Sequence, residues 1–344
     1  MNRPEQADPR AEARTAWTRA VLRDDTAEPI RASMDAGFRS YWRAQAKDAS
    51  GLRDSVIVMD SPPDKEDVRP WLQVRGLLQA GGVRVPQVLA EDVEAGFLLL
   101  EDLGTDTYLH VIDAGNADAL FDDAVTQLLR IQAIATPADL PAYDSALLER
   151  ELRLFDDWFC GRHLGMALDC GDMETLDGAY RTLIDAALAQ TQVLVHRDFM
   201  PRNLMPAADG PAVLDFQDAV LGPIAYDPIS LFKDAFLSWP QERVDAWLAR
   251  YHARAVEAGL SVPELARFRR DADLIGVQRH LKIIGIFARL NHRDGKPKYL
   301  ADTPRFFAYL DAVLPRYPEL SGLQRFIEHK VKPEIARLAA IVRE

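Results

Sequence analysis

The periodicity of the chain changes near residue 104, and this change limits the folds that the chain can adopt. Before it, short segments rich in β-branched and aromatic residues alternate with clusters of turn-forming residues, as in a small sheet. After it, apolar residues recur at intervals of three and four over long segments, which is typical of amphipathic helices. We therefore predict an α+β fold with two lobes. The smaller lobe, residues 1–103, is β-rich with one main helix, and the larger, residues 104–344, is mainly helical.

The predicted elements of the first lobe are strands at residues 38–45, 55–59, 87–91 and 97–101 and a helix at residues 64–80, ended by Gly81 and Gly82. The clearest helices of the second lobe are predicted at residues 120–135, 145–164 and 241–258. Two short apolar pieces, residues 193–195 and 212–214, interrupt this helical pattern. We predict that they pair as a hairpin, which would bring the polar residues after each piece to one end.

Composition and charge exclude several classes of partner. The chain has 344 residues, 48% of them apolar and 27% charged, which is ordinary for a globular protein. Its formal charge of -12 argues against binding to nucleic acid or to an anionic membrane. The apolar runs are far shorter than the roughly 20 residues of a membrane span. We see no secretory signal and no obligate protein partner, and we expect a cytoplasmic protein whose two cysteines, Cys160 and Cys170, are inert thiols.

A polar cluster after the first short apolar piece has the residues that phosphoryl transfer needs. Asp198 would orient the attacking hydroxyl and accept its proton, and Asn203, five residues later, would bind Mg2+, as in the H-R-D-x-x-x-x-N catalytic loop. Asp215, after the second apolar piece, would be a second Mg2+ ligand. His196, at the start of the run, would support the loop. The sequence therefore predicts a magnesium- and ATP-dependent kinase.

A second H-R-D tripeptide, His292–Asp294, shows how little the tripeptide alone means. Tyr299 stands five residues after Asp294 and cannot replace an amide as a Mg2+ ligand, and no predicted strand precedes the tripeptide. The interval from Asp198 to Asn203, together with the preceding strand, distinguishes the first cluster from the second.

Asp227, which precedes Pro228, has two interpretations. Asp followed by Pro is common where a helix begins, so its carboxylate could simply cap the following helix. Alternatively, the carboxylate also braces the catalytic loop.

Several stretches of the chain resemble the aminoglycoside phosphotransferase and choline kinase superfamily, the small-molecule relatives of protein kinases. These stretches are Ala36–Arg43, Val58–Pro63, Phe97–Gly104, His196–Met205, Leu214–Asp227 and His280–Leu290. Within the superfamily they look like bacterial N-acetylmuramate/N-acetylglucosamine kinases of peptidoglycan recycling. The resemblance implies a protein-kinase-like fold and the transfer of phosphate from ATP to the anomeric hydroxyl of the amino sugar. The product would be a sugar 1-phosphate on the route to UDP-N-acetylmuramate.

The resemblance also implies a nucleotide site in the first lobe. Backbone groups at Glu101 and Leu103 would hold the adenine, where the last strand of the lobe ends. The loop at residues 35–40 would approach the phosphates through Arg39 or Ser40, although a surface hairpin with a solvated Arg explains the same residues. This loop has one glycine, so it is not a glycine-rich cradle.

One residue of the kinase pattern is missing. The strand at residues 56–60 lacks the lysine with which kinase-like folds bind the α- and β-phosphates. Arg43 is our candidate for its replacement, with Glu66 or Asp67 as its partner.

The acceptor sugar is expected to lie beside Asp198. Arg202, Gln217 and Asp218 are near the catalytic residues in sequence and have the donors and acceptors that sugar hydroxyls and an acetamido group require. Trp158 could stack on the sugar, although a Trp is more often part of a core.

N-acetylmuramate also has a carboxylate, for which the candidates are Arg279, Lys282 and Arg289. The three residues share one predicted helix, where such cations commonly form only the solvated face.

Two other functions remain open at this stage. The first is a kinase of the same fold that acts on an aminoglycoside, choline or homoserine, whose cationic amines would need acidic or aromatic residues. The second is a catalytically inactive kinase-like binding module, which the missing lysine alone favours.

Overall fold

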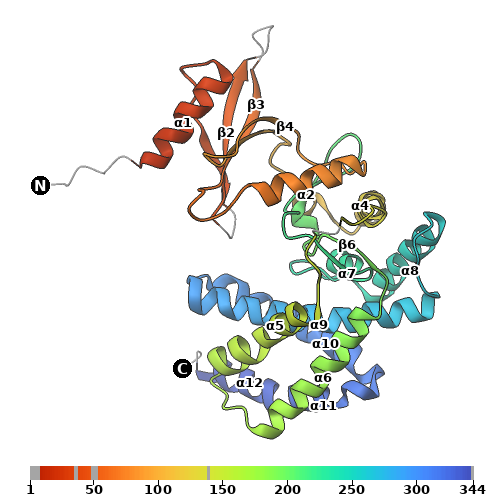
Figure 1. Ribbon diagram of the computed structural model, residues 1–344. Helices are drawn as coiled ribbons and strands as arrows, with labels where there is room; N and C mark the ends of the chain where they lie inside the picture. Colours follow the sequence, from red (N-terminus) through yellow and green to blue (C-terminus); the bar gives the residue numbers. More distant parts are fainter. Residues whose placement is uncertain (1–7, 35–37, 48–52, 138–139, 342–344) are drawn as a thin grey trace, which may run out of the picture. The chain divides into compact units, whose positions relative to one another are not determined.

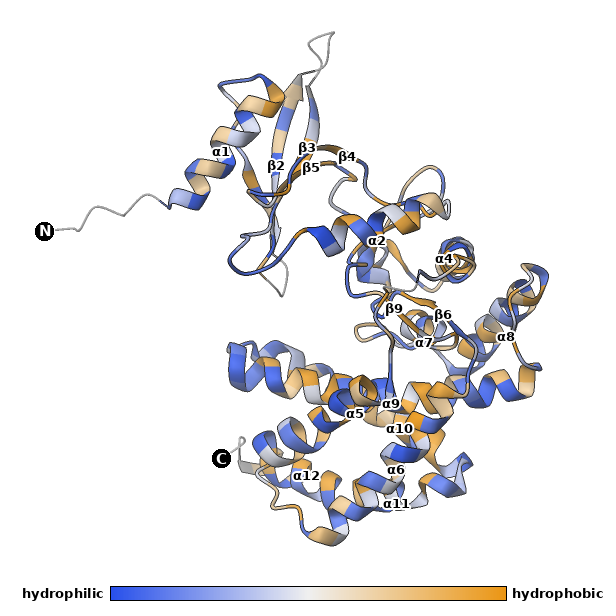
Figure 2. Ribbon diagram, viewed as in Figure 1, coloured by the Kyte–Doolittle hydropathy of each residue, from blue (hydrophilic) through white to orange (hydrophobic). Residues whose placement is uncertain are grey.

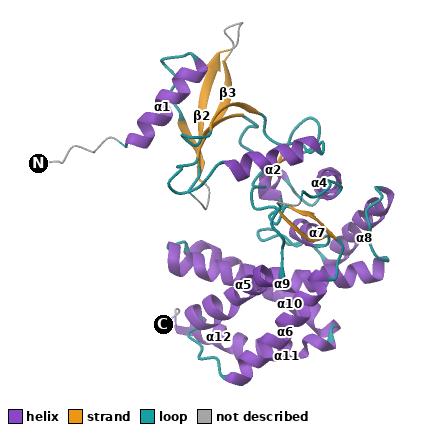
Figure 3. Ribbon diagram, in the orientation of Figure 1, coloured by secondary structure: helices purple, strands orange, loops and turns teal. Residues whose placement is uncertain are grey.

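The computed structural model describes residues 8–34, 38–47, 53–137 and 140–341, and its contacts divide the chain into two compact units. The first unit comprises Met1–His110 and Leu204–Gln217, and the second comprises Val111–Asn203 and Asp218–Glu344. The first unit contains most of the strands and the second is mainly helical, so the predicted α+β class is confirmed (Figure 3). Of the predicted phosphate loop at residues 35–40, residues 35–37 lie outside the described ranges. Among the described helices, none is long and apolar enough to cross a membrane.

The first unit is built on a five-stranded antiparallel sheet with the order β1-β2-β3-β5-β4 (Figure 1). The apolar residues of β3 and β5 pair at its centre, as in Met59 opposite Leu98, and both side chains are fully buried. Figure 2 shows the run of hydrophobic residues in β5. The elements of the unit are α1 (Pro9–Leu22), β1 (Ile30–Met34), β2 (Ser40–Lys47), β3 (Arg53–Asp60), α2 (Arg69–Ala80), β4 (Val88–Asp92), β5 (Phe97–Glu101), β7 (Leu204–Met205) and β8 (Ala212–Val213); α3 (Tyr108–Val111) crosses the boundary between the units.

Helix α1 was not evident in the sequence because its polar residues are spread around the helix and leave no clearly apolar face. It covers one face of the sheet, where Trp17 and Val21 pack against the buried core of β2, β3 and β5 (Figure 1). Its polar residues are also engaged, since Arg10 and Arg14 form ion pairs of 2.7 and 2.8 Å with the buried Asp60 at the end of β3. The helix is therefore held by paired charges as well as by apolar contact.

The predicted hairpin between residues 193–195 and 212–214 is wrong. Strand β6 (Gln192–Val195) pairs instead with β9 (Val220–Pro223). Strand β8 pairs with β7, the short strand that directly follows the catalytic loop. The prediction missed β7 and β9 because both are very short and neither alternates clearly between polar and apolar residues. The pairing of β6 with β9 leads the chain into α7 (Tyr226–Phe232), which bears Asp227.

The second unit is organised around α9, the long helix Leu265–Asp294, which packs against seven other helical segments: α5, η1, α6, α7, α8, η3 and α10. The elements are α4 (Ala117–Gln132), α5 (Ser145–Leu154), the π-helix η1 (Phe155–His163), α6 (Cys170–Leu188), η2 (Pro201–Asn203), α8 (Gln241–Glu257), η3 (Pro297–Asp302), α10 (Thr303–Val313), η4 (Leu314–Arg316), η5 (Pro318–Leu320), α11 (Ser321–Phe326), the π-helix η6 (Ile327–Val331) and α12 (Lys332–Ile341).

The contact between α9 and α5 depends on the absence of a side chain at Gly285. A Cβ atom at this position would lie 2.3 Å from the carbonyl carbon and 2.4 Å from the carbonyl oxygen of Leu154. Backbone atoms cannot rotate away as a flexible side chain can, so the two helices would have to separate.

We therefore expect Gly285→Ala to destabilise the protein by about 1–3 kcal/mol, the usual cost of overpacking. The control is Gly276→Ala in the same helix, where the nearest atom to an added Cβ is 3.6 Å away. That change is expected to be neutral or to stabilise by about 0.5–1 kcal/mol, because Ala loses less backbone entropy than Gly. Denaturant unfolding of both variants measures the difference, and equal effects at the two positions would contradict the close-contact explanation.

Candidate active site

The backbone at the start of the catalytic loop is held by one buried carboxylate. Asp227 accepts hydrogen bonds from the backbone N–H groups of His196, at 2.7 Å, and Arg197, at 3.0 Å. Arg197 has a φ of 75°, in the left-handed region that residues other than glycine rarely adopt. Two charge-assisted hydrogen bonds at this turn stabilise a backbone that is otherwise unfavourable.

Asp227 does not cap α7. The N-cap residue is Ala225, no side chain caps this helix, and Asp227 lies within its first turn. Complete burial raises the pKa of Asp227 to about 6, although the electrostatic interaction with His196 and the two N–H donors oppose this rise. The carboxylate is therefore a bracing group for the loop.

The rest of the catalytic loop is connected by hydrogen bonds within itself. The N–H of Asp198 donates to Nδ1 of the buried His196 at 3.2 Å, and Nδ2 of Asn203 donates to the carbonyl of Asp198 at 2.9 Å. The amide nitrogen of Asn203 is thus used as a donor, which leaves its side-chain oxygen as the atom suited to a cation. Asp198 is half-buried, so it is still accessible to a substrate.

A buried charge network lies beneath the loop. Glu151 of α5 forms ion pairs with Arg197 and, at 2.9 Å, with Lys282 of α9. The second oxygen of Glu151 accepts a hydrogen bond from Tyr143, and Lys282 donates to the hydroxyl of Tyr226 at 3.1 Å. These contacts tie the loop to two helices and to the residue before Asp227.

The charges of this network are mutually stabilised. Burial alone would lower the pKa of Lys282, but Glu151, together with Tyr226 and Asp198, outweighs burial and raises it. Burial would likewise raise the pKa of Glu151, but Lys282 and Arg197 lower it. Removal of one member would leave a buried charge without its partner, which is strongly destabilising. Glu151 was not predicted from the sequence, since a single Glu in an amphipathic helix gives no sign of its contacts.

In the first unit, Arg39 lies between two carboxylates. Its side chain is buried, with Nε 3.2 Å from Glu66 and Nη2 3.9 Å from Asp215. Gln217 donates to Asp215 at 2.9 Å, and Asp215 itself has a φ of 62°. A left-handed conformation at a predicted metal ligand is the kind of strain that is found at functional sites.

Arg43 does not pair with Glu66 or Asp67 as expected. It donates from Nη2 to Asp102 at 3.0 Å and to the carbonyl of Gly104 at 2.8 Å. Burial acts to raise the pKa of Asp102, but hydrogen bonds from Arg43, Ser55 and the N–H of Gly104 outweigh it and lower the pKa. Arg43 therefore fixes the segment that follows β5, and Arg39 is the arginine that pairs with Glu66.

Glu101 and Leu103 flank Asp102 in this segment, whereas Ser40 lies at the opposite end of the sheet, because it pairs with Asp60 and Asp60 pairs with the first residue of β5. Glu101 ends β5 and forms an ion pair with Arg84, whose Nη1 is 2.9 Å from Oε2. Leu103 is half-buried, two residues beyond the strand, and Ser40 is half-buried at the start of β2.

The predicted sugar-binding residues have different surroundings. Arg202 is exposed, with its guanidinium 5.1 Å from the ring centre of Phe236, and the backbone carbonyl of the exposed Asp218 accepts from Arg197 at 3.3 Å. Trp158 is half-buried on the π-helix η1. Gln217, by contrast, is in the first unit, where it orients Asp215.

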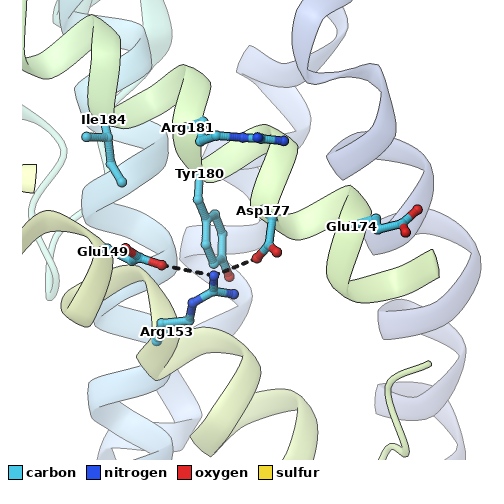
Figure 4. Close-up of a pocket in the computed structure, with 7 residues that line it drawn as sticks. All are labelled: Glu149, Arg153, Glu174, Asp177, Tyr180, Arg181 and Ile184. Carbon is cyan, nitrogen blue, oxygen red and sulfur yellow. Dashed lines mark hydrogen bonds and ion pairs between the residues drawn. The ribbon is translucent and has the colours of Figure 1, made fainter. Parts of the chain in front are cut away.

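A pocket of about 320 Å³ lies apart from these residues, between α5 and α6 (Figure 4). Arg153 is its central cation, and Figure 4 shows the guanidinium between Glu149 and Asp177. A third carboxylate, Asp156, is 3.2 Å away. An arginine surrounded by three carboxylates does not offer a site for a phosphate or another anion, so we assign no function to this pocket.

The fold and the site define a class of protein. Residues 29–269 match the model of the phosphotransferase enzyme family, and the chain belongs to this family.

Similarity to particular relatives is more specific. The chain is 54% identical over 297 residues to the N-acetylmuramate/N-acetylglucosamine kinase of Pseudomonas putida, covering 86% of each chain. It is 42% identical over 323 residues to the kinase of the same name from Neisseria meningitidis, covering 92% of this chain and 95% of that one.

Among solved structures, the chain is similar to an ADP-bound aminoglycoside phosphotransferase, with a TM-score of 0.58, 16% identity and coverage of 86% of this chain and 97% of that one. It is also similar to an ethanolamine kinase of Plasmodium vivax, with a TM-score of 0.60, 11% identity and coverage of 90% and 89%. At these identities the likeness concerns the fold, and it confirms the predicted kinase-like architecture.

The raised pKa of Asp227 predicts a pH dependence of stability. The folded protein holds this proton more tightly than the unfolded chain, so ionisation of Asp227 lowers stability as the pH rises from 3.8 to about 6. Asn does not titrate. The stability of the wild type relative to Asp227→Asn should therefore fall over this range by about 2–3 kcal/mol, measured by denaturant unfolding at several pH values.

Asp227→Asn should also reduce kcat at neutral pH about tenfold or more, because the amide cannot accept from both N–H groups and it turns a donor towards one of them. Asp123→Asn, on the exposed side of α4, is the control and should change neither kcat nor the pH dependence of stability. If the stability of the wild type relative to Asp227→Asn rose between pH 4 and 6, the raised pKa assigned to Asp227 would be contradicted.

Proposed function

We propose that this enzyme is a kinase that transfers the γ-phosphate of ATP to the anomeric hydroxyl of N-acetylmuramate and N-acetylglucosamine, giving the sugar 1-phosphate. The observation on which the choice of sugar rests is the 54% identity to a kinase named for both sugars. The catalytic loop supports the reaction type, because Asp198 is half-buried on a turn that other residues hold in place. The product would supply cell-wall recycling towards UDP-N-acetylmuramate, in the cytoplasm, where ATP is available.

The chemistry requires little covalent participation by the protein. Asp198 would accept the proton of the sugar hydroxyl. At the same time the oxygen of that hydroxyl would form a bond to the γ-phosphorus, and the bond between this phosphorus and the β–γ bridging oxygen would break. Arg197 and Lys282 lie near Asp198, and its negative charge raises the pKa of both residues, although burial and Glu151 affect them more.

The residues that would bind Mg2+ are Asn203 and Asp215. When bound, Mg2+ neutralises the charge of the phosphates and orients them for transfer. Both residues present oxygen atoms of the kind that Mg2+ prefers, and Gln217 orients the carboxylate of Asp215. Among the described residues there is no group of three or more His, Cys, Asp or Glu side chains for a metal ion, and this set has only one carboxylate.

We place the nucleotide in the first lobe, residues 1–103, and the sugar with the second, residues 104–344. Arg39 would contact the phosphates, because it is the arginine paired with Glu66 in the manner of the kinase lysine. Arg43 would act on the adenine side by fixing Asp102 and Gly104 next to Leu103.

The sugar assignment predicts a specific pattern of turnover. With Mg2+ and ATP, N-acetylmuramate and N-acetylglucosamine should stimulate ADP release, whereas choline, homoserine and an aminoglycoside should not. The product should lose reducing-end reactivity, because a phosphate on the anomeric oxygen prevents ring opening. Turnover with another compound alone would refute the sugar assignment, and a product that remains reducing would refute the position of transfer.

Asp198→Asn should abolish most turnover, by about a hundredfold or more, because an amide cannot accept the proton. Affinity for ATP, measured by calorimetry, should change little, since the base is expected to contact the acceptor. Loss of nucleotide binding in this variant would contradict the role of Asp198 as the base.

The complementary variant is Arg39→Ala, which should raise the KM for ATP about tenfold and leave the KM for the sugar nearly unchanged. Its matched control is Arg69→Ala at the start of α2, where an exposed arginine pairs with Asp67 and Glu94. Arg69→Ala should behave as the wild type.

A further inference from the structure

Of the three cations of α9 considered for the sugar carboxylate, Arg279 and Lys282 are fully engaged within the protein. Arg279 is 1% exposed and donates to the hydroxyl of Ser230 at 2.9 Å. Lys282 is buried and is paired with Glu151. Neither side chain can reach a ligand without breaking these contacts.

Arg289, the third cation, differs from both. Its side chain is half-buried, its Nε is buried without a hydrogen-bond partner, and its guanidinium forms no ion pair within the described part of the chain. Burial lowers the pKa of Arg289 and the neighbouring Arg293 lowers it further, although the charges of Asp294 and Glu151 oppose this shift. A partly desolvated cation without a bonded anion is unfavourable, and a bound anion would relieve this.

The packing of α9 shows where Arg289 lies. Three contacts define the register of α9 against α5 and η1: Lys282 with Glu151, Gly285 with Leu154, and His292 with His163 at 3.2 Å. Both segments advance in the same direction along these contacts. Arg289 falls between the second contact and the third, level with Trp158, which is half-buried.

The same register relates Arg289 to the catalytic base. The charge of Asp198 acts on Lys282, and Lys282 is seven residues before Arg289 on a continuous helix. Seven residues of helix span about 10 Å, which is comparable with an amino sugar that carries a lactyl group. A sugar whose anomeric hydroxyl meets Asp198 could therefore extend along α9 towards Arg289.

We propose that Arg289 binds the carboxylate of the lactyl group of N-acetylmuramate, and so determines how well the enzyme uses the anionic sugar relative to N-acetylglucosamine. A guanidinium is suited to this task because it can donate two parallel hydrogen bonds to a carboxylate. N-acetylglucosamine has no carboxylate and makes no such contact. This inference rests on the proposed function of the site.

Arg289→Gln tests the proposal, with steady-state kinetics for the two sugars measured in parallel. We expect kcat/KM for N-acetylmuramate to fall about 10- to 100-fold, mainly through KM, while the value for N-acetylglucosamine changes by less than about threefold. Arg289→Lys should recover part of the loss, because it keeps the charge without the paired donors. In the wild type, the methyl ester of N-acetylmuramate should be a poorer substrate than the acid by a similar factor, and Arg289→Gln should use both forms almost equally.

The matched control is Arg293→Gln, which removes the same charge one turn further along α9 from an exposed arginine already paired with Asp294. It should leave the ratio of the two sugars unchanged, which excludes a general electrostatic effect. An equal loss with both sugars in Arg289→Gln, or no loss with either, would overturn the proposal while leaving the kinase function intact. If the wild type phosphorylates neither sugar, the proposed function fails and this inference fails with it.

Discussion

The carboxylate of Asp227 is the constraint on which the catalytic loop depends. It accepts two backbone N–H groups in succession and so fixes the direction in which the chain leaves β6. Between those N–H groups and the base lies a residue with a positive φ, a conformation that costs about 1–3 kcal/mol when nothing supports it. The direction of the Asp198 side chain therefore follows from a contact made by α7.

The charge network beneath the loop extends this constraint to the rest of the second unit. Arg197 donates one of the two backbone hydrogen bonds to Asp227. The side chain of Arg197 pairs with Glu151, which in turn pairs with Lys282. Together with Asp198 and Asp227, the network contains two cations and three carboxylates, so positive and negative charges largely offset each other before a substrate binds. Such balance lets charged groups stay ionised in a partly buried place, because each is stabilised by an opposite charge nearby.

The sequence predicted the parts of the fold whose information is local. The strands at residues 97–101 and the helices after residue 104 have clear periodicity, and the structure has β5, α4, α5 and α8 there. The prediction from sequence failed where an element depends on residues that are far away in the chain. The pairing of β6 with β9 joins residues about 30 positions apart, and helix α1 is held partly by ion pairs to Asp60, which no local pattern shows.

The candidate site divides in the same way. The spacing from Asp198 to Asn203 reflects a local loop, and it was visible in the sequence. The partners of that loop, Glu151 and Lys282, come from two separate helices, and their contacts are decided by packing. Arg39 was visible as a candidate, but its pairing with Glu66 in place of Arg43 was not.

The absence of the kinase lysine has a structural explanation in the first unit. Ser40 is paired with Asp60 across β2 and β3, so Arg39, the residue before Ser40, enters the end of the sheet at which β3 stops. A cation can thus reach Glu66 from the neighbouring strand. Asp60 does not cancel its charge, because Arg10 and Arg14 of α1 already neutralise that carboxylate. Helix α1 therefore has an electrostatic consequence besides covering the sheet: its arginines neutralise Asp60, while Arg39 pairs with Glu66 and lies 3.9 Å from Asp215.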